Sequence, residues 1–354
     1  MASGPPTLPA APWGPLVVAP LIGAAGGALF WWLTLPLPWM LGSMVAVTVA
    51  ALSGVKVHLP PWVRSVMITV IGVMLGASFT PAAIARMGQW LVTLAGLAAC
   101  SAALGLVGWV WFRHVAKFDP VTAYFSAAPG GLNEMVLVGG AMGGDDRTIA
   151  LVHATRVFLV VFTIPVWYRF HGAPLGGSGG RPFVGLTEIA WIDVAILAAC
   201  AIVGAPLARR LKVPAAFLLG PMALSAAVHL TGATGSSPPT LLVSAAQVAI
   251  GTTLGCRFSG TPLGLIGRTL RHAAAAAVLL IAITVGFAVV VDRFVDLPLA
   301  ALILAYAPGG LPEMSLLAFA LAIDAGFVAA HHLARLIMVI TIAPLFFRVL
   351  GRKP

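Results

Sequence analysis

The stretch Ala128–Met135 reads APGGLNEM and interrupts an apolar run with a proline, two glycines and an acid. The chain repeats this string 179 residues later, where Ala307–Met314 reads APGGLPEM. The same offset relates eight further pairs of residues on both sides of the string. These pairs are Gly72 and Gly251, Gly76 and Gly255, Phe79 and Phe258, Asp145 and Asp324, His153 and His332, Arg156 and Arg335, Pro165 and Pro344, and Arg169 and Arg348. So many matches at one spacing indicate an internal duplication.

The composition is that of a membrane protein. Hydrophobic residues make up 60% of the chain, charged residues only 8%, and the mean hydropathy is +1.04. The net charge of +10 does not indicate nucleic-acid binding, because the basic residues are scattered between apolar runs instead of clustering on one face. Three cysteines and eight dispersed histidines suggest neither a disulfide framework nor a metal site. We therefore expect no metal and no cofactor, and the bilayer is the first predicted partner.

Ten apolar runs are each long enough, or nearly so, to cross roughly 30 Å of hydrocarbon. They lie at about 15–34, 38–54, 63–79, 89–112, 148–168, 189–208, 214–231, 240–256, 272–291 and 326–347. The sequence thus predicts an all-α polytopic membrane protein. Membrane repeat 1 would span 15–168, a glycine-rich linker 169–188, and membrane repeat 2 189–348.

The topology depends on the segments around the two Pro-Gly-Gly strings, at about 120–143 and 297–323. If both cross fully, Lys and Arg divide ten to eight between the two sides, which is no bias. If both enter the membrane and return, fourteen lie on the side of the N-terminus, four on the other and two within the membrane. The second arrangement obeys the positive-inside rule. It predicts two inverted five-helix repeats with re-entrant hairpins and cytoplasmic termini in a bacterial inner membrane, although broken spanning helices remain an alternative.

Each string predicts a backbone break followed by a half-helix that begins at Leu132 or Leu311. Proline lacks an amide donor and glycine adopts dihedral angles that other residues avoid. Irregular backbone at membrane depth is tolerated only where it is buried in protein or lines a cavity. The free amides at the start of a half-helix favour an anion. The alternative is a purely structural kink. The candidate binding residues in the two breaks are Pro129, Gly130, Gly131, Pro308, Gly309 and Gly310.

Two acids and four basic residues complete the candidate site. Glu134 and Glu313 lie about one turn into the half-helices, and an acid inside a bilayer needs a partner. Arg156 and Arg335 are the expected partners; each follows a histidine (His153 or His332) by three residues, on the same helix face. We expect the two arginines to help bind the substrate. The two acids and the two histidines are the candidates for coupling substrate movement to an ion. A static ion pair that fixes helix register is the alternative.

The doubled string, with a His-x-x-Arg segment after each copy, resembles the bacterial AbrB-duplication membrane proteins over about residues 15–350. That resemblance implies two inherited labels, ammonia monooxygenase and AbrB-type regulator of gene expression. Neither label fits the residues: a copper oxygenase needs clustered ligands, and the similarly named DNA-binding regulators are small soluble domains.

The sequence therefore favours a secondary transporter over an enzyme. It would move a small anionic solute with protons or Na⁺, and a broken, acid-bearing helix in each half is typical of such proteins. A membrane regulator or sensor is the alternative, and a membrane enzyme is less favoured. A small molecule or ion would be the substrate, and the sequence is compatible with a homo-oligomer.

Overall fold

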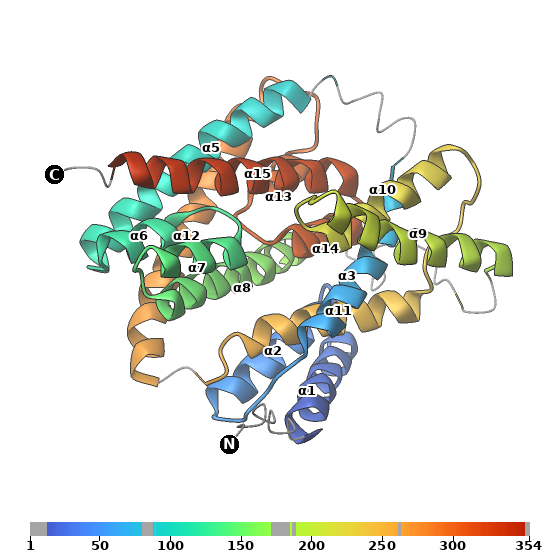
Figure 1. Ribbon diagram of the computed structural model, residues 1–354, viewed down its shortest axis with the longest axis horizontal. Coiled ribbons are helices and arrows are strands. Elements are labelled where there is room, and N and C mark those ends of the chain that lie inside the picture. The colour runs from blue at the N-terminus through green and yellow to red at the C-terminus, as the bar shows by residue number, and fades with distance from the viewer. Residues whose placement is uncertain are drawn as a thin grey trace, which may run out of the picture.

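The computed structural model describes residues 13–79, 88, 90–170, 185, 189–260 and 263–350, and the regular structure in this part of the chain is helical throughout. Its fourteen α-helices repeat in the order that the duplication predicts (Figure 1). The first repeat contains α1 (Trp13–Trp32), α2 (Pro38–Leu52), α3 (Pro61–Gly76), α5 (Trp90–Val110, continued by a π-helical turn Trp111–Val115), α6 (Pro120–Ala127), α7 (Leu132–Ala141) and α8 (Asp146–Phe170). The second contains α9 (Trp191–Arg210), α10 (Ala216–Leu230), α11 (Thr240–Cys256), α12 (Leu263–Asp292), α13 (Leu299–Tyr306), α14 (Leu311–Ala320) and α15 (Ala325–Leu350).

Five helices in the described residues are long and apolar enough to cross a membrane. They are Trp90–Val115, Asp146–Tyr168, Trp191–Arg210, Gly267–Asp292 and Ala325–Ala343. The other five predicted spans also form apolar helices at the expected places, and four of these are shorter. Helices α2, α3, α10 and α11 have 15 to 17 residues, or roughly 22–26 Å at 1.5 Å per residue.

Large apolar side chains on the long helices are exposed, as lipid contact requires. Leu91 in α5 is 76% exposed, Ile202 in α9 72% and Val278 in α12 67%. A water-soluble protein rarely exposes such side chains along whole helices. The exposure therefore agrees with a multi-pass membrane protein.

The helices pack as two groups, each of which draws on both repeats. The first group, α1–α3 with α9–α11, contains the pairs α1–α2, α9–α10, α3–α10 and α2–α11. The second group, α5–α8 with α12–α15, is joined by the pairs α5–α12 and α8–α12 and contains both Pro-Gly-Gly segments. Figure 1 shows the first group along the lower centre (α1, α2, α11) and the right (α9, α10), and most of the second group at the upper left. The sequence repeats are thus not two separately packed bodies, and the predicted linker at 169–188 lies almost entirely outside the described residues.

Glycines hold the first group together where helices of different repeats cross. A β-carbon at Gly72 in α3 would collide with the backbone of Leu218 in α10. Its repeat partner Gly251 in α11 lies in the same way against Met40 in α2. Small residues allow such close backbone approach between membrane helices. The first three helices of each repeat therefore pack closely against the first three helices of the other repeat.

Candidate functional site

The first Pro-Gly-Gly segment is a break between two short helices, α6 and α7. Gly131 caps α7 with φ 64° and ψ 50°, the left-handed region that favours glycine. The chain then turns back, since a β-carbon at Gly139 would touch Phe125 and one at Gly144 would touch Val121. The returning chain is fixed by the amide of Asp145, which donates to Thr122 Oγ1 at 2.8 Å. Together, α6 and α7 thus form a helical hairpin with the glycines at its tip.

The second break, between α13 and α14, has the same length but a different backbone. Gly310 precedes α14 in an extended conformation, with φ −79° and ψ 149°. Pro312 occupies the first turn of α14, where its missing amide costs no helical hydrogen bond. Both half-helices begin where the sequence predicts, at Leu132 and Leu311.

A buried arginine binds the carbonyls that each break leaves free. Arg156 Nη1 donates to the carbonyl of Ala128 at 2.7 Å, and Arg335 Nη1 donates to that of Ala307 at 2.6 Å. Arg335 Nη2 also donates to the carbonyl of Gly309 at 3.1 Å. Both arginines are only 2–3% exposed. Each guanidinium therefore replaces the helical amides that the break removes.

The histidine one turn earlier extends each arginine network. Arg156 Nη2 lies 3.0 Å from His153 Nδ1, and Arg335 Nη2 lies 2.7 Å from His332 Nδ1. The other ring nitrogen, Nε2, is 2.9 Å from a backbone carbonyl in both histidines. A carbonyl only accepts and a guanidinium only donates, so Nε2 carries the hydrogen and Nδ1 accepts. Both rings are thus held in one neutral tautomer, which argues for a structural role.

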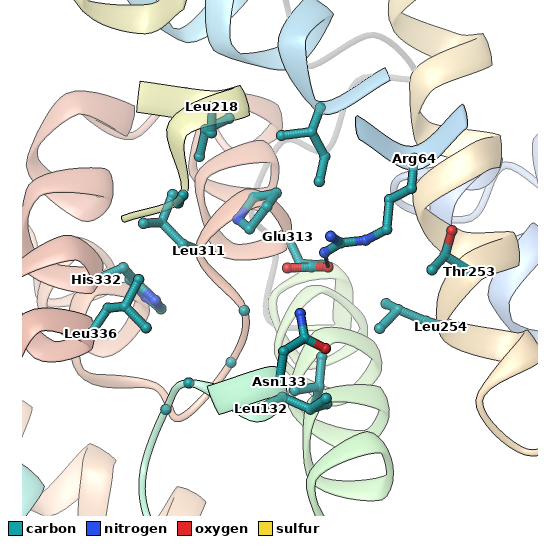
Figure 2. A pocket seen from close by; sticks show the side chains of 18 of the residues that line it. Arg64, Leu132, Asn133, Leu218, Thr253, Leu254, Leu311, Glu313, His332 and Leu336 are labelled. Carbon is teal, nitrogen blue, oxygen red and sulfur yellow. Dashed lines mark ion pairs between the residues drawn. The ribbon is translucent and has the colours of Figure 1, made fainter. Parts of the chain in front are cut away.

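The two breaks meet at one cavity of about 230 Å³, between the two groups of helices. A β-carbon at Gly130 would lie 3.6 Å from Arg335 Nε, so the tip of the first hairpin reaches α15 of the second repeat. Figure 2 shows the two loops side by side below Glu313. Residues from both breaks line the cavity: Gly130, Gly131, Leu132, Asn133, Glu134, Gly309, Gly310, Leu311, Pro312 and Glu313.

Helix α3 and helix α11 supply two arginines to the facing wall. Arg64 Nη2 lies 3.9 Å from Glu313 Oε1, and its side chain is 29% exposed (Figure 2). Arg257, which follows α11, donates from Nη2 to Asn133 Oδ1 at 2.9 Å. In the described residues these are the polar side-chain contacts that join the two groups across the cavity.

The two acids occupy different environments. Glu313 is 2% exposed, and its Oε2 has no hydrogen-bond partner among the described residues. Glu134 is half-buried and also lines the cavity. The amides of Leu132, Asn133 and Glu134 in α7 have no backbone acceptor in the described residues. The cavity therefore combines guanidinium groups, free amides and two carboxylates.

A family model described as transition state regulatory protein AbrB matches residues 39–351. The chain belongs to this family. It is similar to an uncharacterised protein of Bacillus subtilis (strain 168), YhjN, with 29% identity over 93% of this chain and 91% of that protein. It is also similar to a protein of Escherichia coli (strain K12) named as a proposed regulator, AbrB, with 24% identity over 97% and 98% of the two chains.

In this member of the AbrB family, the structure brings some of the predicted site residues to the cavity and not others. Glu134, Glu313, His332, Arg335 and the four glycines of the breaks line it. Pro129, Pro308, His153 and Arg156 are not among its lining residues. The arginines bind carbonyls and histidines, whereas the predicted ion pairs of Arg156 with Glu134 and of Arg335 with Glu313 are not formed in the described residues. The partner of Glu313 is instead Arg64.

The sequence interpretation missed Arg64 and Arg257, which it counted among the residues that set orientation. Neither has a basic partner at the 179-residue offset, where Val243 and Ser78 stand. An internal repeat therefore could not reveal them. The repeated acids Asp145 and Asp324 lie outside the cavity lining and cap helices: Asp145 accepts from Thr148 Oγ1 at 2.6 Å and Asp324 from the amide of Phe327 at 3.0 Å, as caps of α8 and α15 do.

Proposed function

We propose that this protein is a secondary transporter of a small anionic solute, coupled to the movement of a cation, and not an enzyme. One observation carries the proposal: both helix breaks and both acids of the duplication line a single cavity between two groups of helices. Transporters with internal repeats bind substrate and coupling ion where broken helices of the two repeats meet. A static kink would not require both breaks to face one cavity.

The solute class follows from the chemistry of the cavity. Arg64, Arg257 and Arg335 line it together with the N-terminal turns of two ten-residue half-helices. Guanidinium groups and free helical amides both favour a negatively charged group. The cavity volume of about 230 Å³ limits the solute to a small molecule or ion. A small carboxylate or a similar oxyanion fits these features.

We propose further that the repeats are inverted and that the two hairpins are re-entrant, in a bacterial inner membrane with cytoplasmic termini. The first turn of α3 (Arg64, Ser65) and the last turn of α11 (Thr253, Leu254) line the same cavity. Because α3 and α11 also pack against each other, this supports two equivalent helices that pass the cavity in opposite directions, as inverted repeats do. The return of Gly144 to Val121 in the first hairpin supports a segment that enters and leaves on one side.

Movement of one group of helices against the other would give alternating access. The cavity lies at the boundary between the groups, and the polar contacts across it are Arg64 with Glu313 and Arg257 with Asn133. The hydrogen bond is exposed and can break at little cost. The ion pair is long, but its carboxylate is buried, so it breaks readily only where another group compensates Glu313. A solute that replaces Glu313 and Asn133 on the two arginines would alter the contact between the groups.

Reconstitution into liposomes tests the proposal. The full chain would be assayed with acetate, succinate, sulfate and phosphate, and an entrapped pH dye and radiolabelled anions would report flux. We expect one or more anions to accumulate in a proton- or Na⁺-gradient-dependent way, and Glu134→Gln with Glu313→Gln to abolish this uptake. Uptake that is unchanged in the double variant would refute the site.

The name of the relative from Escherichia coli motivates a second candidate, a membrane regulator. A regulator would bind an anion at the same cavity without net flux. Binding measured by thermal shift in the absence of any flux in liposomes would therefore favour the regulator over the transporter.

A further inference from the structure

We infer that Arg64 is a counterion shared between Glu313 and the bound anion, so that each anion that binds is accompanied by a proton taken up on Glu313. The inference rests on the proposed transport of an anion and assigns its coupling ion. It also gives the two acids of the duplication different roles, which the sequence repeat alone does not suggest.

The first step is the charge balance around Glu313. A carboxylate that is 2% exposed needs compensation, and in the described residues Arg64 is the one basic group within 4.0 Å of it. The Oε2 atom of Glu313 accepts no hydrogen bond from any described residue. Figure 2 shows the Glu313 carboxylate and the Arg64 guanidinium pointing toward each other across the cavity. The ionised form of Glu313 thus depends on a single, distant counterion.

The other charged groups near the cavity are already engaged or lie elsewhere. Arg335 and Arg156 donate to the carbonyls of the breaks and to their histidines, and both histidines are held neutral. Arg257 donates to Asn133. Glu134 is a second acid and supplies no positive charge. The titratable and charged groups that line the cavity with Glu313 are therefore Arg64 (α3), Glu134 (α7), Arg257 (after α11), and His332 and Arg335 (α15). Arg156 and His153 (α8) bind the first break and do not line the cavity.

An anion that enters this cavity competes with Glu313 for Arg64. If the anion takes the guanidinium, two negative groups share one counterion inside the protein, which is unfavourable unless one of them is neutralised. A proton on Glu313 removes that conflict. The reaction is then balanced: a carboxylate paired with Arg64 becomes a carboxylic acid, and an anion paired with Arg64 takes its place. For a singly charged anion the net charge of the site does not change.

A proton fits this exchange better than Na⁺. A bound Na⁺ would keep a full positive charge next to the Arg64 guanidinium and would need several oxygen ligands. A proton leaves an uncharged acid whose O–H can donate to the anion. The orphaned Oε2 would gain its missing hydrogen-bond partner in this way. Glu134 is half-buried and has no basic partner within 4.0 Å in the described residues, so its ionised form does not depend on Arg64.

The experiment measures proton uptake and the protonation of Glu313 on addition of an anion. The full chain, purified in detergent, would receive the tightest-binding member of the panel acetate, succinate, sulfate and phosphate. A pH dye in weak buffer would count protons, and infrared difference spectra would detect the carboxylic C=O band. We expect proton uptake equal to the amount of anion bound, and an affinity that rises by up to about tenfold per unit fall in pH.

Substitutions of three acids separate these roles. Glu313→Gln should bind the anion without proton uptake, without the infrared band and without the pH dependence. Glu134→Gln should still take up one proton for each anion that it binds. Asp296→Asn, at an exposed acid outside the cavity lining, is the control and should behave as the wild type. Arg64→Gln, at a partly exposed position, should weaken anion binding at least tenfold and show the carboxylic band before any anion is added.

The outcomes separate this inference from the function on which it rests. Anion binding without proton uptake, binding that requires Na⁺ instead, or a band that persists in Glu313→Gln would overturn the inference and leave anion transport standing. Wild-type affinity in Arg64→Gln would overturn it as well. If no anion of the panel binds to the wild-type protein, the proposed function fails and the inference fails with it.

Discussion

At the scale of single residues, the two buried arginines show how the fold tolerates broken helices inside an apolar protein. Each break exposes carbonyls that no helical amide can reach, and in hydrocarbon no water replaces that amide. Arg156 and Arg335 satisfy the equivalent carbonyls of Ala128 and Ala307. The two His-x-x-Arg segments are thus explained by the structure of the breaks before any role in binding is considered.

Substitution of Arg335 should therefore lower stability. Arg335→Gln would leave the carbonyls of Ala307 and Gly309 and the ring of His332 without their donor. Each hydrogen bond to a charged group contributes about 1.5–3 kcal/mol, so we expect a loss of about 3 kcal/mol or more. Thermal unfolding of the purified protein measures the loss. Arg257→Gln, at an exposed position, is the control and should change the melting temperature little. Equal melting temperatures for Arg335→Gln and the wild type would contradict the structural role.

The sequence singled out the glycines and acids that line the cavity, but not the partner of Glu313. Glu313 stands out because it is an acid in an apolar run that recurs at a fixed offset. Arg64 follows Pro60 and Pro61 at the beginning of the apolar run 63–79, where basic residues that set orientation are common. Only the packing of α3 against α14 brings it to the cavity.

At the scale of helices, the duplication identifies the glycines that recur, while their packing partners required the structure. Gly72 and Gly251 both recur within the duplication, which indicates that α3 and α11 have equivalent surroundings. The sequence contains no information on whether such a helix packs within its own repeat or on the other. In the structure, each packs on the second helix of the other repeat.

This arrangement predicts the effect of a single methyl group. Gly251→Ala would place a β-carbon against the backbone of Met40 and force α11 away from α2. Overpacking of this kind costs about 1–3 kcal/mol. Gly286→Ala in α12, where a β-carbon meets nothing within 4 Å, is the matched control and should be neutral or slightly stabilising. Thermal unfolding of both variants measures the difference; a Gly251→Ala variant as stable as Gly286→Ala would show that the helices do not pack as closely as described.

At the scale of the whole molecule, composition and apolar runs predicted a helical membrane protein with helices at nearly the observed positions. They did not predict that the helices would sort into two mixed groups. That sorting depends on contacts between segments far apart in the chain, such as α3 with α10. The distribution of Lys and Arg adds one more prediction, the orientation of each repeat in the membrane.

Opposite orientation of the two hairpins is the prediction that tests this topology. Asp146 and Ala322 are both exposed and follow α7 and α14 at the ends of the two hairpins. In a background without Cys100, Cys200 and Cys256, Asp146→Cys should react with a membrane-impermeant thiol reagent only after the cells are opened. Ala322→Cys should react in intact cells, because an odd number of spans separates the hairpins. Reaction of both cysteines under the same condition would mean parallel repeats. The cavity would then join two hairpins from one side of the membrane, and the alternating-access proposal would lose its basis.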